Sequence, residues 1–414
     1  MLEKMKNAWR IPELRKKIIY TFLMLLIYRL LCVIPVPGIN VAKVSEAVST
    51  YSILDFMNMM TGGSFQNMSI MAMGITPYIN SSIILQLLTV AIPALEKLSK
   101  EGPEGRKKIT EYTRYLTVVL AFVQAIGLVF AMRANSNGGI WYIVIGLSMA
   151  AGTSLAMWIG ERITENGLGN GISLLIMAGI VSNMFNWAVS AIRGMAQGTV
   201  NPLAVVVVLA AMLVMIVAIT YVDMGERRIP VQYAKRVVGR KMYGGQSTHI
   251  PMKLNSTGVL PLIFGFAILQ FPATIFAFFP TSGANIWWQN FQSGVAYQVV
   301  LALLIIAFTY FYTSITFNPV DISKNMQQNG GIIPGVRQGR ATSDFLARVS
   351  SRLTLFSALF LAVLATIPTL LTRLFGISAP FGASSVLIAV SVGIETIRQI
   401  EAQMVMRHHK GFLG

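Results

Sequence analysis

The sequence predicts an all-α polytopic membrane protein, with ten transmembrane helices in two inverted five-helix halves and one additional short helix. Three observations support this fold class. The 414 residues are 54% hydrophobic and only 12% charged, whereas soluble domains carry about 25% charged residues. Apolar runs of about 20 residues, the length needed to cross a bilayer, recur along the chain. Basic residues gather in alternate segments between those runs.

The predicted spans divide equally between an N-terminal half, residues 1–200, and a C-terminal half, residues 201–414. In chain order we place them at residues 18–36, 68–92, 114–132, 140–160, 172–190, 202–222, 257–280, 296–317, 352–372 and 380–397. Because each half holds an odd number of spans, the second half would cross the membrane in the opposite sense to the first.

The charge of the loops sets the predicted orientation. Lys and Arg are abundant at the N-terminus, in residues 93–114, 223–255 and 318–350, and in the C-terminal tail. Basic loops stay in the cytoplasm, so we expect both termini to be cytoplasmic. The net charge of +17 lies mostly in these loops. Its placement favours anionic lipid or a cytoplasmic partner over recognition of a specific nucleic acid sequence.

Two stretches that lie 184 residues apart read as the same helix start. Gly74, Pro77 and Gln86 recur as Gly258, Pro261 and Gln270 at identical offsets, together with shared Ile and Leu positions. Two apolar helices could share Ile and Leu by chance, but a shared Gly, Pro and Gln in register favours an internal repeat. Inverted repeats place functional sites near the membrane midplane between the repeats.

Residues 52–63 are too short and too polar to span the membrane. Ser52 is a candidate helix N-cap with Asp55 three residues later, and Gly62-Gly63 would end the helix. Two interpretations stay open from these residues. The helix lies flat at the bilayer surface, or it folds back into a cavity of the protein.

The chain offers no catalytic set, cofactor motif or metal site, so we do not expect an enzyme. Its histidines lie in a loop and in the tail, and Cys32 is its one cysteine. Arg29 stands inside the first apolar run, where a charge costs about 2.5–3.5 kcal/mol. It could belong to a site, pair with the Glu395 end of the last span, or snorkel to the surface. No Asp or Glu lies deep in a span, which disfavours an ion-driven transporter.

Uncharged polar residues in several spans suit water-filled vestibules, and branched aliphatic residues between vestibules can form a constriction that blocks ions by dewetting. Ile79 and Ile263, which are equivalent in the two repeats, are candidates for such a constriction. Taken singly, each isoleucine is better explained by ordinary packing than by a constriction.

Motifs along almost the whole chain resemble those of the SecY family of protein-conducting channels. The motifs are Met73-Gly74-Ile75-Thr76-Pro77-Tyr78-Ile79, Glu101-Gly102-Pro103-Glu104-Gly105-Arg106-Lys107-Lys108, Gly167-Leu168-Gly169-Asn170-Gly171-Ile172-Ser173, Tyr233-Ala234-Lys235-Arg236, Gln246-Ser247-Thr248-His249-Ile250-Pro251, Phe317-Asn318-Pro319 and Ile333-Pro334-Gly335-Val336-Arg337. The resemblance implies two halves that form a clam shell around an hourglass pore.

The same resemblance assigns roles to individual residues. It implies a pore ring of Ile79, Ile83, Ile176, Ile263 and Ile388. It implies a plug helix near residues 52–63 that contains Ser52, Ile53, Leu54, Asp55, Phe56, Met57, Asn58, Met59, Met60 and Thr61. It places Gln86, Gln124 and Asn255 at a lateral gate. Contacts to the SecA ATPase or the ribosome would come from Arg227, Arg228, Lys235, Arg236, Arg240 and Arg337.

By resemblance, the chain is expected to be the pore-forming subunit of a protein translocase in the bacterial plasma membrane. It would be a passive, gated channel for secretory polypeptides that also opens sideways to insert membrane segments. Its expected partners are SecE, SecG, SecA, the ribosome, and a secretory preprotein or signal peptide. The chain departs from the usual family pattern at Gln338, where a proline is common, and at Arg340, so we expect a less stiff loop.

Overall fold

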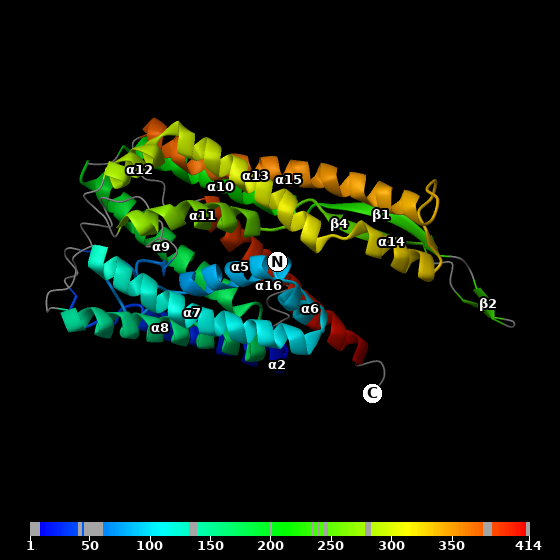
Figure 1. The fold of residues 1–414 in the computed structure, drawn as a ribbon, viewed down its shortest axis with the longest axis horizontal. Helices are drawn as coiled ribbons and strands as arrows, with labels where there is room; N and C mark the ends of the chain where they lie inside the picture. The colour runs from blue at the N-terminus through cyan, green and yellow to red at the C-terminus, as the bar shows by residue number, and fades with distance from the viewer. Residues whose placement is uncertain are drawn as a thin grey trace. The chain divides into compact units, whose positions relative to one another are not determined.

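The structure, a computed structural model, describes residues 9–39, 44, 61–131, 139–198, 201–233, 236–238, 241–243, 247–277, 283–375 and 383–410. The described chain is mostly helical (Figure 1). It divides into two compact units. The first unit contains residues 1–207, 267–293 and 378–414, and the second contains residues 208–266 and 294–377. The predicted boundary between halves at residue 200 stays a prediction.

Each predicted span contains a helix. The helices of the first unit are α2 (Pro12–Leu31), α5 (Thr76–Ala91), α6 (Pro93–Lys100), α7 (Pro103–Ala131), α8 (Gly139–Asn166), α9 (Gly171–Ala196), α12 (Gly283–Ser293) and α16 (Ala383–Lys410). The helices α10 (Pro202–Met224) and α11 (Leu260–Ala277) have residues in both units. The second unit adds α13 (Val295–Thr316), α14 (Pro319–Gln328) and α15 (Arg340–Phe375).

Six described helical segments are long and apolar enough to cross a membrane, and a seventh is added if α5 and α6 form one bent span. The bend between α5 and α6 is 102°. Pro93 explains it, because proline supplies no backbone N–H and forces the preceding residue, Ile92, into an extended conformation. The helical membrane fold is therefore confirmed in outline, whereas the ten-helix inverted arrangement stays a prediction.

The predicted second span starts eight residues too early, because α5 begins at Thr76 and not at residue 68. Residues 62–75 form a series of turns instead of a helix. Gly74 has φ +53°, a left-handed conformation that suits glycine, and Pro77 follows in the first turn of α5.

The second copy of the repeat begins in the same way. Gly258 has φ +61°, and α11 starts two residues later with Pro261 in its first turn. The shared Gly and Pro thus encode one local backbone geometry at both helix starts.

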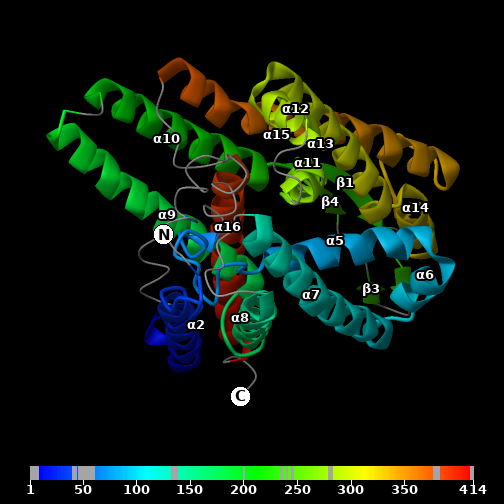
Figure 2. The same cartoon turned by 60° about the vertical axis from the view of Figure 1, so that its left-hand side comes forward.

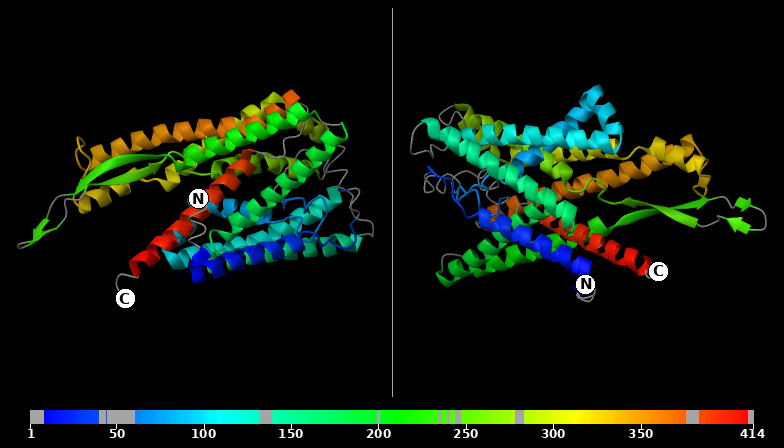
Figure 3. Two further views of the ribbon diagram at one scale, coloured as in Figure 1. Left: turned by 180° about the vertical axis from the view of Figure 1, so that it is seen from behind. Right: turned by 90° about the horizontal axis from the view of Figure 1, so that it is seen from below.

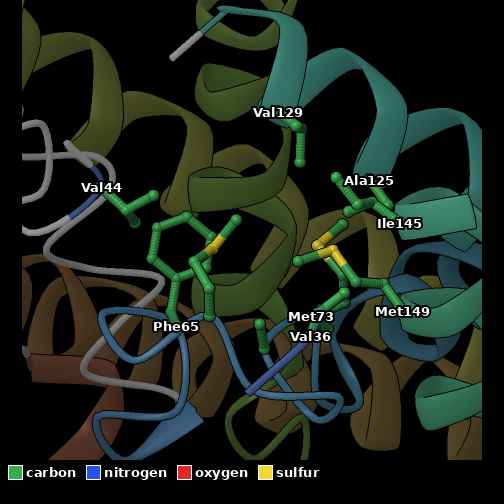
Figure 4. Packing of buried hydrophobic residues seen from close by; sticks show 10 residues of the cluster. Val36, Val44, Phe65, Met73, Ala125, Val129, Ile145 and Met149 are labelled. Carbon is green, nitrogen blue, oxygen red and sulfur yellow. The ribbon is translucent and has the colours of Figure 1, made fainter. Parts of the chain in front are cut away.

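The turns of residues 62–75 are buried against neighbouring helices. Backbone hydrogen bonds join Val36 N to Met68 O at 2.9 Å and Ile70 N to Ile34 O at 2.9 Å. Phe65, Met68 and Met73 pack in an apolar cluster with residues of α7 and α8, including Met149 (Figure 4). This cluster holds the segment that leads from the predicted plug into α5.

Helix packing in the first unit depends on a well-defined loop before α9. Asn170 caps α9 by accepting hydrogen bonds from the backbone N–H groups of Ile172 and Ser173. The Thr21 hydroxyl of α2 accepts a hydrogen bond from Leu168 N at 3.0 Å. Helix α16 then packs along α9 (Figure 2). The Gly167–Ser173 motif therefore works as a connection that fixes three helices together.

The expected cytoplasmic loops of the second unit contain a small sheet, which the all-α prediction missed. Strands β1 (Glu226–Tyr233), β4 (Ser247–Lys253) and β5 (Gly331–Ile332) form an antiparallel sheet in the order β4-β1-β5, and β2 (Arg236–Val238) pairs with β3 (Lys241–Tyr243). The β1–β4 ribbon runs along α14 and α15 (Figure 3). Ile229 and Val231 alternate toward the core, but basic and proline neighbours obscure this short apolar pattern in the sequence.

One prediction follows from the close approach of the turns to α8. A methyl group on Gly152 would overlap the backbone carbonyl of Ile70, and backbone cannot move aside as a side chain can. We expect Gly152→Ala to destabilise the protein by about 1–3 kcal/mol through overpacking. The temperature of thermal inactivation in detergent measures this loss of stability. Gly393→Ala in α16 is the control, because nothing lies within 4 Å of the added methyl group; equal losses for both variants would contradict the prediction.

Candidate functional site

Two of the predicted pore-ring residues line one small pocket in the first unit. Ile79 comes from α5 and Ile176 from α9, two helices that lie far apart in the sequence. The pocket has a volume of about 10 Å³, room for no more than about one water molecule. It is lined by Tyr28, Thr61, Gly74, Ile75, Thr76, Ile79 and Ile176. Branched aliphatic side chains and the end of the predicted plug therefore meet at one place.

The other ring candidates lie on three helices. Ile83 follows Ile79 by one turn on the same face of α5 and is buried. Ile388 is buried on α16, the helix that packs along α9. Ile263 is half-buried on α11 in the second unit. A closed ring of all five residues stays a prediction.

The predicted plug falls largely outside the described residues. Only Thr61 of that set is described, and it is buried with 2% of its surface exposed. Its backbone oxygen accepts a hydrogen bond from the Ser64 hydroxyl at 2.9 Å, and its hydroxyl accepts one from Phe65 N at 3.3 Å. The residue that ends the predicted plug is thus fixed at the wall of the pocket.

The gate candidates occupy different surroundings. Gln86 on α5 and Gln124 on α7 are half-buried on two helices that pack together. Asn255 is buried in the second unit, just before α11. Its amide nitrogen donates to Asp223 Oδ1 at 3.1 Å, and its amide oxygen accepts from the Ser357 hydroxyl at 3.0 Å. Asn255 therefore joins the end of α10 to α15.

The sheet of the second unit carries exposed arginines above an apolar core. Arg227 and Arg228 are exposed at the start of β1, and Arg228 forms an ion pair with Glu226 at 2.7 Å. Ile229, Val231 and residues of α14 and α15 form the core beneath them. We call this sheet with α14 and the start of α15 the cytoplasmic assembly, after the side of the membrane that the basic loops predict for it. Lys235 and Arg240 lie outside the described residues, and Arg236 lies in β2.

Arg337 is exposed on a loop of the cytoplasmic assembly that several hydrogen bonds hold in place. The Thr342 hydroxyl donates to Arg337 O at 2.8 Å, and the Ser323 hydroxyl donates to Gly339 O at 2.7 Å. Gln338, which stands where the family often has proline, donates from its side-chain amide to Gly331 O at 3.3 Å. A side-chain hydrogen bond thus restrains the loop at the position where proline stiffness is missing.

Another basic segment follows α5. In α6, Lys100 Nζ lies 2.6 Å from Glu96 Oε1, and this hydrogen bond together with the lysine charge holds the pKa of Glu96 below its ordinary value. Both side chains are exposed, so the ion pair contributes little to stability. Among the described residues, no group of three or more His, Cys, Asp or Glu could hold a metal ion.

Comparison with known proteins identifies the family of this chain. The family model described as SecY matches residues 69–397, which is most of the chain. The protein translocase subunit SecY of Streptomyces galbus is 42% identical over 442 aligned residues, which cover 100% of both chains. The chain belongs to the SecY family.

Solved structures of SecY-type channels share its fold. A SecY protein whose plug domain stabilises the closed state of its translocation channel has a TM-score of 0.69 and 19% identity, covering 94% of this chain and 92% of its own. The channel of a canine ribosome–channel complex from the endoplasmic reticulum has a TM-score of 0.68 and 18% identity, covering 94% of this chain and 93% of its own. At such identities the likeness concerns the fold alone.

Sequence reasoning missed several residues around the SecY-family site. Tyr28 is buried and lines the pocket beside Ile79 and Ile176, although it stands in an ordinary apolar run. Its neighbour Arg29, the charge inside that run, was the signal that could have directed attention to this turn of α2. Asp223 was likewise unmarked as the partner of Asn255, because 32 residues separate the two in sequence.

The network around Asn255 yields a stability prediction. Asn255→Leu removes the side-chain amide that binds Asp223 and the Ser357 hydroxyl, and the loss of a buried hydrogen bond in this way costs about 1–3 kcal/mol. We therefore expect a lower thermal-inactivation temperature in detergent for the variant. Thr220→Val is the control, because the hydrogen bond that its hydroxyl makes among the described residues stays within α10, to Ile216 O. A variant Asn255→Leu as stable as the parent would contradict the role of Asn255 as a structural tie.

Proposed function

We propose that this SecY-family chain is the pore-forming subunit of a protein translocase, a passive and gated channel for unfolded polypeptides. The observation that carries the proposal is the meeting of Ile79, Ile176 and the plug residue Thr61 at one small pocket. The translocase subunit of Streptomyces galbus, to which the chain is 42% identical over its whole length, supports it.

The proposed pore does no chemistry. Its ring of Ile79, Ile83, Ile176, Ile263 and Ile388 would exclude water at the constriction, since aliphatic constrictions block ions by dewetting. The same flexible aliphatic side chains could close around a moving polypeptide. The plug near residues 52–63 would seal the resting channel, as the plug domain does in the SecY protein of known structure.

In the proposed architecture, ten helices form two inverted halves, and secretory chains pass between them. The helices that carry Gln86 and Gln124 would part from α11 and α13 to open a lateral gate for apolar segments. Asn255, just before α11, would tie its side of the gate to α15. This arrangement is supported by the repeated Gly-x-x-Pro helix starts, which share a left-handed glycine.

Because the pore supplies no energy, we propose that a bound SecA ATPase or a translating ribosome drives transport. The cytoplasmic assembly displays Arg227, Arg228 and Arg337 at its surface, and a positive surface suits acidic protein or ribosomal RNA. The canine channel of similar fold is found in a complex with the ribosome. SecE, SecG and anionic lipid would complete the assembly in the bacterial plasma membrane, with both termini in the cytoplasm.

A stalled secretory chain tests the channel directly. In a variant with Cys32→Ser, single cysteines replace Ile79 or Ile263, and a cysteine in the stalled chain is offered for disulfide formation. We expect crosslinks at both positions, because each residue would contact the moving polypeptide. The products are counted on non-reducing gels.

A cysteine at Phe22, an exposed position on α2, is the control and should give no product. A chain that is trapped at neither Ile79 nor Ile263 would instead favour a small-solute transporter with inverted repeats.

The motor contact is tested by reversing one charge. We expect Arg337→Glu to abolish SecA-driven translocation into vesicles, because a carboxylate would repel the acidic surface that the arginine is proposed to bind. Preprotein protected from protease is the measurement.

Lys324→Glu makes the same charge change at an exposed position on α14 and should retain most activity. Normal translocation by Arg337→Glu, at normal membrane levels of the channel, would remove Arg337 from the proposed coupling site.

A further inference from the structure

Arg29 is a charged residue inside the apolar run of α2, and its partner was left open by the sequence. In the structure, the partners of Arg29 are two backbone carbonyls. The guanidinium donates from Nη1 to Gly62 O at 3.4 Å and from Nη2 to Ala178 O. It also lies 5.9 Å from the ring centre of Tyr28. These are the contacts that the structure gives, and the Glu395 end of α16 is not among them.

The three groups come from separate parts of the first unit. Arg29 is on α2, Gly62 lies at the end of the predicted plug, and Ala178 is on α9. A guanidinium carries five donors in a rigid, planar fork, so it can hold two carbonyls that face it from different elements. Backbone carbonyls are also known partners of arginine inside membrane spans, where they take the place of a carboxylate.

This contact requires glycine at position 62. Its φ of +66° is left-handed, and a Cβ would lie 2.6 Å from Arg29 Nη2 and 2.7 Å from the backbone oxygen of Gly179. Only a residue without a side chain lets the guanidinium and α9 approach so closely. Gly63 provides a contrast, because it is also left-handed at φ +86° but its Cβ would meet nothing closer than Asn186 Nδ2 at 4.0 Å.

The contact lies next to the pocket of the candidate pore. Thr61, which precedes Gly62, lines that pocket, and so does Ile176, which precedes Ala178 by two residues. Tyr28, the neighbour of Arg29, lines it too. Each partner in the contact is therefore one or two residues from a pocket-lining residue. By binding both carbonyls, the guanidinium fixes the distance between the plug end and α9 beside the pocket.

We propose that Arg29 is a positioning residue that anchors the end of the plug, Thr61 and Gly62, to α9 and so holds the channel in its resting, sealed state. This inference rests on the proposed function, because it assigns an anchor to the plug of that channel. Movement of the plug would require the guanidinium to release at least one of two charge-assisted hydrogen bonds.

The first test compares resting ion conductance of the full-length channel in planar bilayers. We expect Arg29→Gln to raise it about tenfold, which corresponds to the loss of one charge-assisted hydrogen bond. Arg29→Lys keeps the charge but loses the fork, so its conductance should fall between those of the parent and Arg29→Gln.

The second test uses the adjacent glycines as a matched pair. Gly62→Ala and Gly63→Ala both place a side chain on a left-handed backbone, but only the first collides with Arg29. We expect Gly62→Ala to leak as Arg29→Gln does, and Gly63→Ala to stay close to the parent. The double variant of Arg29→Gln and Gly62→Ala should leak no more than either single variant, because both substitutions break the same contact between Arg29 and Gly62.

A third measurement separates anchoring from general destabilisation. In a Cys32→Ser background, cysteines at Thr61 and Ile176 are joined by oxidation, and we expect Arg29→Gln to slow that reaction while the thermal stability of the channel stays within a few degrees of the parent. Parental conductance and parental crosslinking in Arg29→Gln would overturn the proposal. Equal leakage of Gly62→Ala and Gly63→Ala would also overturn it, because the leak would then follow backbone strain.

If Arg29→Gln fails to fold, the comparison of conductance between Gly62→Ala and Gly63→Ala tests the anchor by itself, since Gly62→Ala keeps the arginine in place. The outcome is also separable from that of the proposed function. Trapping of a stalled chain at Ile79 and Ile263, combined with parental conductance in Arg29→Gln and Gly62→Ala, rejects the anchor and keeps the channel. Failure to trap the chain at both positions rejects the channel itself.

Discussion

The need to satisfy every backbone polar group away from water governs the structure around the candidate pore. A helix satisfies its own groups, but the turns of residues 62–75 do so only in part, through bonds such as that from Ser69 N to Ser64 O. Other groups pair with the chain between α2 and residue 39, as in the bonds between Val36 and Met68 and between Ile70 and Ile34. Side chains contribute as well, since the Ser64 hydroxyl binds Thr61 O and the Arg29 guanidinium binds Gly62 O. An irregular segment can therefore lie among membrane helices because α2, α7, α8 and α9 contact it.

Glycine makes this enclosure possible at three places, each for a different reason. Gly74 supplies the left-handed backbone that turns the chain into α5. Gly152 lets α8 approach the carbonyl of Ile70, where any side chain would overlap backbone. Gly62 combines both requirements, because its backbone is left-handed and the guanidinium of Arg29 occupies the space of a side chain. Close backbone contacts therefore hold the plug end, the pocket and the start of α5, in addition to the packing of large side chains such as Phe65 and Met68.

The cytoplasmic assembly follows a different physical plan. It lies in parts of the chain expected to face water, and it has its own small apolar core of Ile229, Val231 and Met252. Basic residues stay at its surface, where solvation is inexpensive, while hydrogen bonds from Thr342, Ser323 and Gln338 restrain the loop that bears Arg337. A folded assembly presents such arginines in a defined geometry, which a solvated connector would not.

Periodicity and apolar length predicted the helices well, because burial in a membrane demands long apolar runs whatever the neighbours are. The start of α5 was placed too early because the turns before it are as apolar as a helix. The β1–β4 ribbon was missed because its inward residues are few and lie among arginines and prolines. Asn255 was expected at a gate, yet its partners Asp223 and Ser357 became visible only when α10 and α15 were packed together.

By itself, the sequence determined the class of protein, the approximate positions of the long apolar helices and the repeated Gly-x-x-Pro starts, because these depend on composition and local backbone preference. It also carried the motifs by which the chain joins the SecY family. Only the tertiary structure decided that Ile79, Ile176 and Thr61 share a pocket, and that Arg29 binds the carbonyls of Gly62 and Ala178. The physical reason is that the two bonds of Arg29 join residues 33 and 149 positions apart, and no local pattern specifies which carbonyl a buried guanidinium will find.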